Sequence, residues 1–280
     1  MELIVRKHSR IDILDAIRGF AIISMVVYHG LYDINDIFGF KMGIFDFFTL
    51  LEPWFAGAFI LLCGVSCRFS HSNAKRGARV VAIAMVVTVV TVLFSVFISP
   101  GQEIYFGILH FMGFAILIYA LVHKPLDRIK PYIALPLFIV LFAITYTMPW
   151  TYQIGLPGFA VQLPMSLASA SGTLFSNIDT IFKVTSPSWL PGVIGLYPIG
   201  LPDINYFLSA DYFPLIPWIF LFFAGTVIGV PVKEHRLPEK FYTARVPFFA
   251  TAGRNTLLIY AVHQPVIYIL LLLLFNIFPH

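Results

Sequence analysis

The chain from Arg10 to Asp33 reads Arg-Ile-Asp-Ile-Leu-Asp-Ala-Ile-Arg-Gly-Phe-Ala-Ile-Ile-Ser-Met-Val-Val-Tyr-His-Gly-Leu-Tyr-Asp. This stretch starts with charged residues, continues as an apolar run of about three helical turns, and ends at His29 and Asp33. The apolar centre predicts a membrane-spanning helix that carries ionisable groups at both ends. Such groups are costly in or beside a membrane, so by default they indicate a functional role.

The charged residues fall into two sets. Asp12, Asp15 and Arg18 recur at a spacing of three, so in a helix they lie toward one side and can pair. An ion pair at the inner membrane interface is the purely structural alternative. His29 and Asp33 are four residues apart and share a face near the other end, where a merely structural histidine is again the alternative.

The composition excludes an ordinary soluble domain. Of the 280 residues, 59% are hydrophobic and 11% are charged, with a mean hydropathy of +0.87, whereas soluble domains carry roughly 25% charged residues. The apolar runs are long and lack the alternation of a barrel strand, which favours helices. We therefore predict an all-α, polytopic helix bundle in the lipid bilayer, with residues 1–280 forming a single transmembrane domain.

Seven segments are long and apolar enough to cross a hydrocarbon core of about 30 Å. The predicted spans are residues 13–31, 48–67, 80–98, 104–122, 132–150, 212–230 and 255–277.

The basic residues predict the orientation of these spans. All of the 18 lysines and arginines except Lys41 and Lys183 precede or open the first span, or lie between spans two and three, four and five, or six and seven. The positive-inside rule makes this side cytoplasmic, so we expect a multi-pass protein of the cell membrane with its N-terminus inside and its C-terminus outside. This distribution also explains the net charge of +4 without any binding of nucleic acid.

The predicted outer side is acidic and carries one long connection, residues 151–211, that is too interrupted to span and too apolar to float freely. We predict an extracytoplasmic cap, since loops of this length are functional lids or disordered. The acidic residues are solvated loop charges or line an outer pocket that attracts an amino-bearing acceptor. They are Asp33, Asp36, Asp46, Glu52, Glu103, Asp179, Asp203 and Asp211.

Titratable residues near the outer ends of the spans are the candidates for catalysis. His29 and His110 are predicted at a similar depth, with Asp33 and Glu52 nearby, and histidine suits general acid–base chemistry near neutral pH. Glu52 orients His29 or binds an acceptor amine, or it is only part of an interfacial anchor. His263 is predicted near the midplane of the last span, where a satisfied core histidine is the alternative.

The cytoplasmic side offers a candidate phosphate site where the segment from Ala252 to Leu257 opens the last span. A helix N-terminus presents free N–H groups and a positive dipole end, although the positive-inside rule alone also explains the charges. The candidate phosphate-binding residues are Arg18, Lys75, Arg76, Arg79, Arg254 and Asn255. Cys63 and Cys67 are expected to be small core residues, and no metal site is predicted because further ligands are missing nearby.

Several motifs resemble one family, the bacterial relatives of heparan-α-glucosaminide N-acetyltransferase within the wider group of transmembrane acyltransferases. The likeness covers nearly the whole chain except 151–211. It is carried by the opening stretch from Arg10 to Asp33, by Phe55 to Ser66, by Phe106-Gly-Ile-Leu-His110, by Tyr212-Phe-Pro-Leu-Ile-Pro-Trp218 and by Gly253-Arg-Asn-Thr-Leu-Leu-Ile-Tyr-Ala-Val-His-Gln-Pro265.

The resemblance implies an enzyme that moves an acyl group, expected to be acetyl, from cytoplasmic acyl-CoA to an amine or hydroxyl acceptor, a sugar or glycan, on the outer side. His263 then belongs to the cofactor-binding residues, and no metal is required. His29 is the functional residue of the first helix, as a base for direct attack or as an acetyl carrier. Because the lysosomal branch is expected to carry an amide residue at this position, His110 and Glu52 are the alternatives.

Two other functions are compatible with the same residues. Intramembrane histidines and acids can relay protons in a proton-coupled transporter, although we find no inverted repeat of the kind that many transporters carry. A non-catalytic membrane scaffold or sensor is the third candidate. A homo-oligomer is compatible with the sequence.

Overall fold

The structure is a computed structural model that describes residues 11–151, 153–156, 159–162, 197–201, 209–243 and 246–277. Its chain forms two compact units. The first combines Met1–Leu62 with Pro231–His280, and the second is Cys63–Val230. Among the described residues, seven helices are long and apolar enough to cross a membrane, which confirms the predicted all-α class.

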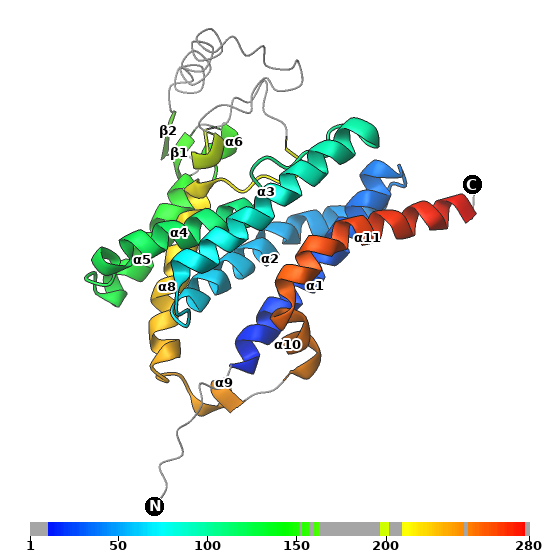
Figure 1. The fold of residues 1–280 in the computed structure, drawn as a ribbon. Coiled ribbons are helices and arrows are strands. Elements are labelled where there is room, and N and C mark those ends of the chain that lie inside the picture. Colours follow the sequence, from blue (N-terminus) through cyan, green and yellow to red (C-terminus); the bar gives the residue numbers. More distant parts are fainter. Residues whose placement is uncertain are drawn as a thin grey trace, which may run out of the picture. The chain divides into compact units, whose positions relative to one another are not determined.

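The first unit is built around its N-terminal helix. The elements of this unit are α1 (Asp12–Tyr32), a π-helix η1 (Asp33–Ile37), most of α2 (Gly43–Cys67), α9 (Glu239–Thr243), α10 (Pro247–Arg254) and α11 (Thr256–Ile277). Figure 1 shows α10 in orange and α11 in red beside the blue α1, although they come from opposite ends of the chain.

Two glycines set the distance between α1 and α10. A Cβ added at Gly19 of α1 would overlap the backbone carbonyl of Phe249, and one added at Gly253 of α10 would overlap the carbonyl of Asp15. Small residues at a helix crossing let two backbones approach closely. Phe20 closes the crossing with an edge-on contact to Phe249, with ring centroids 5.8 Å apart.

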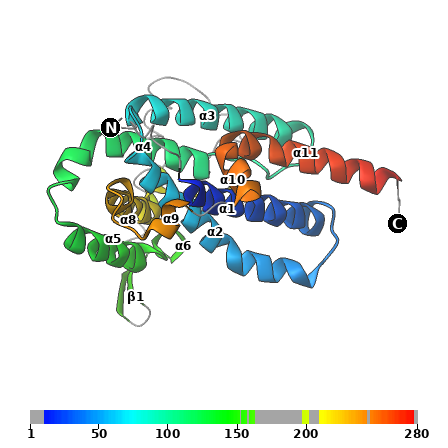
Figure 2. The same ribbon diagram turned by 90° about the horizontal axis from the view of Figure 1, so that it is seen from below.

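The second unit packs around α4. The elements of this unit are α3 (Asn73–Phe97), α4 (Ile108–Leu126), α5 (Pro131–Thr145), α6 (Met148–Thr151), β1 (Gln153–Leu156), β2 (Phe159–Gln162), η2 (Tyr197–Ile199) and most of α8 (Leu215–Lys233). The helices α3 and α4 run side by side (Figure 2). Gly77 and Gly113 allow this contact, since a Cβ at either would press on Leu117 or Val81 of the other helix.

Arg68 ties several segments of the second unit together. Its Nε donates to the carbonyl of Thr226 in α8 at 2.8 Å, and its Nη1 lies 2.7 Å from the Asp127 carboxylate just after α4. The guanidinium also lies over the ring of Tyr119, 5.5 Å from the centroid. A part-buried arginine with three such partners links the segment just after α2 to the end of α4 and to the interior of α8.

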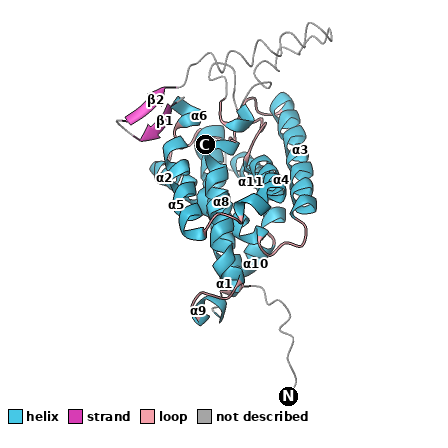
Figure 3. Cartoon of the chain, turned by 90° about the vertical axis from the view of Figure 1, so that its left-hand side faces the viewer, coloured by secondary structure: helices cyan, strands magenta, loops and turns pink. Residues whose placement is uncertain are grey.

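The two strands form an antiparallel hairpin, drawn in magenta in Figure 3. Both strands belong to the long connection of residues 151–211, which the sequence predicted to form an extracytoplasmic cap. Most of that segment lies outside the described residues. Near its end, Tyr212 donates a hydrogen bond from its hydroxyl to the carbonyl of Tyr197 at 2.7 Å. Burial raises the pKa of the Tyr197 phenol.

Most spans begin and end within a few residues of the predicted boundaries, but α2 begins at Gly43 rather than at residue 48, and α3 begins at Asn73 rather than at residue 80. The earlier start of α3 places Lys75, Arg76 and Arg79, which the sequence assigned to a loop, inside the helix.

A further shift concerns His110. The fourth helix was predicted to begin at residue 104 but begins at Ile108. The preceding residues are held in extended geometry, because Phe106 forms a bridge with Tyr212 and accepts a hydrogen bond from Phe213 at 3.0 Å. His110 is therefore the third residue of α4, rather than a residue well inside a span that starts at residue 104.

Candidate functional site

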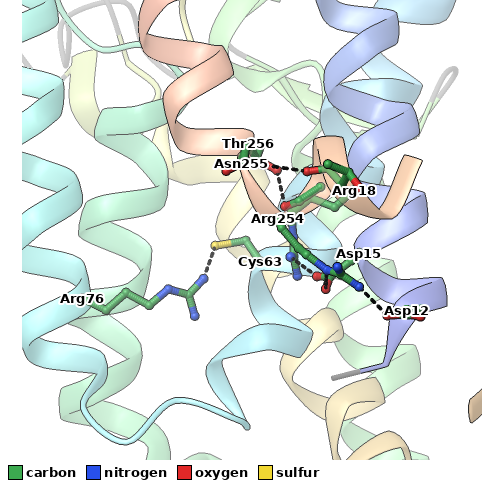
Figure 4. A network of polar contacts seen from close by, with 10 residues as sticks. Asp12, Asp15, Arg18, Cys63, Arg76, Arg254, Asn255 and Thr256 are labelled. Carbon is green, nitrogen blue, oxygen red and sulfur yellow. Dashed lines mark hydrogen bonds and ion pairs between the residues drawn. The ribbon is translucent and has the colours of Figure 1, made fainter. Parts of the chain in front are cut away.

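A cluster of opposite charges lies where the start of α1 meets the end of α10 (Figure 4). The guanidinium of Arg254 lies 2.7 Å from Asp12 Oδ1 and 3.7 Å from Asp15 Oδ2, and Arg18 lies 2.7 Å from Asp15 Oδ1. We call these four residues the acid–arginine cluster. The spacing of Asp15 and Arg18 predicted their pairing, and the pair is present.

The acid–arginine cluster engages Arg254, one of the residues predicted to bind phosphate. The sequence treated Arg254 as a phosphate ligand at the start of a span, but Arg254 ends α10 and Thr256 begins α11. Two carboxylates already hold the Arg254 guanidinium. Asn255 donates from its side chain to the carbonyl of Thr251 at 3.0 Å, so its amide stabilises the end of α10.

The other end of α1 carries a second cluster, formed with α11. The imidazole rings of His29 and His263 lie 5.0 Å apart between centroids. One helical turn further along α1, the carboxylate of Asp33 accepts a hydrogen bond from Gln264 Nε2 at 2.8 Å. We call His29, Asp33, His263 and Gln264 the histidine–amide cluster.

The histidine–amide cluster is a polar site in an apolar helix pair. Asp33 is fully buried, and His263 is 8% exposed. Asp33 opens the π-helix η1, a rare geometry that is found frequently at functional sites. From Arg18 to His29 the axis of α1 rises about 16 Å, which separates this cluster from the acid–arginine cluster along one helix.

His110 lies in the second unit and has a partner at each ring nitrogen. Its Nδ1 accepts from the backbone N–H of Gly107 at 3.3 Å, which caps the start of α4. Its Nε2 therefore carries the proton in the neutral ring and donates to Thr88 Oγ1 at 3.0 Å, whose hydroxyl donates to the carbonyl of Ile104 at 2.8 Å. These hydrogen bonds give His110 a structural role at the start of α4.

Asp211 supports the same helix start. Its Oδ2 accepts from the backbone N–H of Ile108 at 3.0 Å, and a helix N-terminus favours a carboxylate. Glu52, the other predicted acid, lies on α2 of the first unit within electrostatic range of the Tyr28 hydroxyl. Of the predicted catalytic residues, His29 and Asp33 thus belong to one cluster, while His110 belongs to the other unit.

The basic residues predicted near phosphate lie in the first two turns of α3. Lys75 and Arg79 are exposed. Arg76 points its guanidinium at two sulfur atoms of the same unit, 3.5 Å from Cys63 and 3.9 Å from Cys67 (Figure 4). Both cysteines are buried thiols. Among the described residues, no group of three or more histidine, cysteine, aspartate or glutamate side chains could hold a metal ion.

The sequence did not single out Gln264 or the backbone of Tyr260, which accepts a hydrogen bond from His263 at 2.7 Å. A polar residue beside a histidine inside an apolar span was the available signal for Gln264. Its partner Asp33 is distant along the chain, so the pairing appears only once α1 and α11 are packed.

The comparison with known families identifies the chain. The model of the family described as heparan-alpha-glucosaminide N-acetyltransferase, catalytic, matches residues 10–265. No curated protein and no solved structure is significantly similar to the chain. The matched region contains both ends of α1, the charged start of α3 and the His263–Gln264 pair. The chain therefore belongs to the heparan-alpha-glucosaminide N-acetyltransferase catalytic family and is an acyl-CoA-dependent, multi-pass membrane acyltransferase.

Proposed function

We propose that this enzyme moves an acetyl group from cytoplasmic acetyl-CoA to an amino sugar on the outer side of the cell membrane. The observation that carries the proposal is the histidine–amide cluster, which joins two imidazoles and a buried carboxylate between membrane-spanning helices. The family name supports an N-linked acetyl product on a glucosaminide acceptor. A hydroxyl group of a sugar is the other acceptor compatible with this chemistry.

The proposed sidedness rests on the distribution of basic residues. The positive-inside rule assigns the start of α1, the start of α3 and the segment before α11 to the cytoplasm. Acetyl-CoA then approaches from that side, while the end of α1, which is followed by Asp33 and Asp36 in η1, and the C-terminal end of α11 face outward. The proposal treats residues 1–280 as one functional domain.

The phosphates of acetyl-CoA are proposed to bind at the start of α3. Helix N-termini disfavour cations through the helix dipole, yet Lys75, Arg76 and Arg79 all lie in the first two turns. Bound phosphate removes this conflict. Arg18 and Arg254 contribute only if phosphate displaces Asp15 or Asp12, because both arginines are paired with these aspartates. Asn255 contributes only if its amide leaves the carbonyl of Thr251.

The proposed reaction is a direct attack of the acceptor nitrogen on the thioester carbonyl. As the C–N bond forms, His29 takes a proton from the attacking nitrogen; the C–S bond then breaks and the sulfur leaves as a thiolate. The thiolate takes the proton from the His29 imidazolium and leaves as CoA thiol. An acetyl-histidine intermediate at His29 is the covalent variant of the same reaction.

Replacement of His29 tests this function. A missing general base costs about 10²–10⁴ in rate, so His29→Ala should lose most thiol release from acetyl-CoA and still bind acetyl-CoA with near-parental affinity. The measurement combines turnover and affinity in a monodisperse, detergent-purified variant. The matched control is His71→Ala, since His71 is exposed outside the spans. Turnover of His29→Ala within a few-fold of the parent would exclude His29 as the base.

A further inference from the structure

Three buried polar atoms of the histidine–amide cluster have no hydrogen-bond partner in the part of the chain that the structure describes. They are Asp33 Oδ2, His263 Nε2 and Gln264 Oε1. Buried side-chain atoms without a partner are rare in folded proteins, and each calls for an explanation. Here they belong to three neighbouring side chains, so one bound group can explain all of them.

The existing bonds show that all three atoms are acceptors. His263 Nδ1 lies 2.7 Å from the carbonyl oxygen of Tyr260, which only accepts, so Nδ1 carries the hydrogen. In the neutral ring Nε2 then keeps a lone pair. Gln264 turns its amide nitrogen to Asp33 Oδ1 at 2.8 Å, which leaves its carbonyl oxygen and the second carboxylate oxygen for another partner.

A set of acceptors selects the chemistry of its ligand. A protonated amine brings three N–H donors and a positive charge beside Asp33, whereas phosphate or carboxylate would bring further acceptors and a repelling charge. The histidine–amide cluster therefore fits the acceptor substrate, and it does not fit the phosphates of acetyl-CoA. This moves His263 away from the cofactor-binding set to which the sequence assigned it.

We propose that Asp33, His263 and Gln264 form the subsite for the protonated amino group of the acceptor, and that His263 receives the first proton from it. This inference rests on the proposed acetyl transfer. Gln264 is a positioning residue, because its amide holds one oxygen of Asp33 and leaves the other for the ammonium. His263 is a catalytic residue, because its Nε2 contacts the reacting nitrogen.

The two imidazoles then account for the two protons that the reaction removes. The ammonium gives one proton to His263 Nε2, and the freed lone pair attacks the thioester carbonyl to form the C–N bond. The attacking nitrogen gives its second proton to His29, and the C–S bond breaks. The thiolate takes the proton from His29 and leaves as CoA thiol, while the proton on His263 leaves to solvent. Rings 5.0 Å apart suit two transfers at one nitrogen.

The test uses glucosamine as the acceptor and acetyl-CoA as the donor with the full chain in detergent. Asp33→Asn and Gln264→Leu should raise the KM for glucosamine by roughly tenfold or more, because each disturbs a buried charged contact. Both should leave the Kd of acetyl-CoA near the parental value. His263→Gln keeps an acceptor atom but loses the base, so kcat should fall while the KM for glucosamine changes little.

Asp36→Asn is the matched control. It removes the same charge from the same π-helix, but Asp36 pairs with the exposed Lys41 at 3.4 Å and lies outside the cluster. Its KM for glucosamine should equal that of the parent. Unchanged KM values in both Asp33→Asn and Gln264→Leu, or a loss confined to acetyl-CoA affinity, would overturn the subsite while the acetyl transfer stands.

Calorimetric titration of glucosamine in the absence of acetyl-CoA separates the two proposals. Weaker binding to Asp33→Asn than to the parent supports the subsite whether or not the parent turns over. Equal binding to both proteins refutes it. A parent that binds glucosamine but releases no thiol from acetyl-CoA would contradict the proposed function alone.

Discussion

At the scale of single residues, the structure separates histidines that are alike in the sequence. His110 has a bond at each ring nitrogen and caps α4, whereas His263 keeps one buried nitrogen without a partner among the described residues. A ring with both nitrogens bonded is poorly suited to accept a substrate proton. The available lone pair therefore favours the histidine–amide cluster over His110 as the place of proton transfer.

His110→Ala is expected to affect stability rather than chemistry. The variant loses the cap on Gly107, and caps contribute typically about 1 kcal/mol, so the melting temperature should fall while turnover per folded molecule stays close to that of the parent. His71→Ala serves as the control. A fall in kcat of about 10² or more at an unchanged melting temperature would show instead that His110 takes part in the reaction.

The exposed cations of α3 allow a second prediction at this scale. Replacing Lys75 and Arg79 together by glutamine should weaken acetyl-CoA binding by roughly tenfold, because hydrogen bonds to charged groups are among the stronger ones. The loss should shrink at high salt. Arg236→Gln is the control, since Arg236 is an exposed arginine paired with Glu234 at 2.9 Å. Equal affinity in the double variant and in the control would mean that the α3 charges only set topology.

At the scale of elements, the crossing of α1 and α10 holds the acid–arginine cluster in place. Gly19 and Gly253 face each other's helix backbones, and the ion pairs of Arg254 lie beside this contact. A side chain at the crossing would push α10 away and separate Arg254 from Asp12. The short helix α10 thus contributes to stability through its close backbone contact with α1 rather than through a large apolar face.

Gly253→Ala should therefore destabilise the protein, by about 1–3 kcal/mol or more as for other overpacked contacts. The measurement is thermal unfolding in detergent with monodispersity as a second readout. Gly43→Ala is the matched control, because nothing lies within 4 Å of a Cβ built at Gly43 in α2. If both variants melt at the same temperature as the parent, the crossing is looser than the structure indicates.

The sequence predicted the spanning elements better than the short ones. Long apolar runs identify α1 or α11 directly, since length and hydropathy are local properties. The eight-residue helix α10 was placed in a loop, because its stability depends on packing against Gly19. The hairpin was also missed, although a Pro-Gly dipeptide between its strands is a turn signal.

The site was predictable only in part for the same reason. His29 and Asp33 stand out as titratable residues four apart in an apolar helix, and the sequence singled them out. Their partners His263 and Gln264 come from the opposite end of the chain, and no local pattern shows which helix packs on which. Arg254 illustrates the converse, since a charge that looks available in the sequence is held by two carboxylates in the structure.

At the scale of the whole molecule, the proposed path of the acetyl group leads from the basic side of the membrane to the acidic side. In the first unit, α1 contributes to both clusters, with Asp12, Asp15 and Arg18 near its start and His29 near its end. Under the proposed function, the thioester arm follows this length of helix and the acceptor meets it from the other side. Transfer across the membrane, rather than on one face, is the central claim.

Vesicles containing the purified protein test this claim most directly. Glucosamine is trapped inside, radiolabelled acetyl-CoA is added outside, and the labelled sugar and the free CoA thiol are measured on each side. The account predicts N-acetylglucosamine inside and CoA thiol outside, with neither formed by vesicles that carry His29→Ala. Product that forms only when glucosamine and acetyl-CoA share one side of the membrane would contradict it.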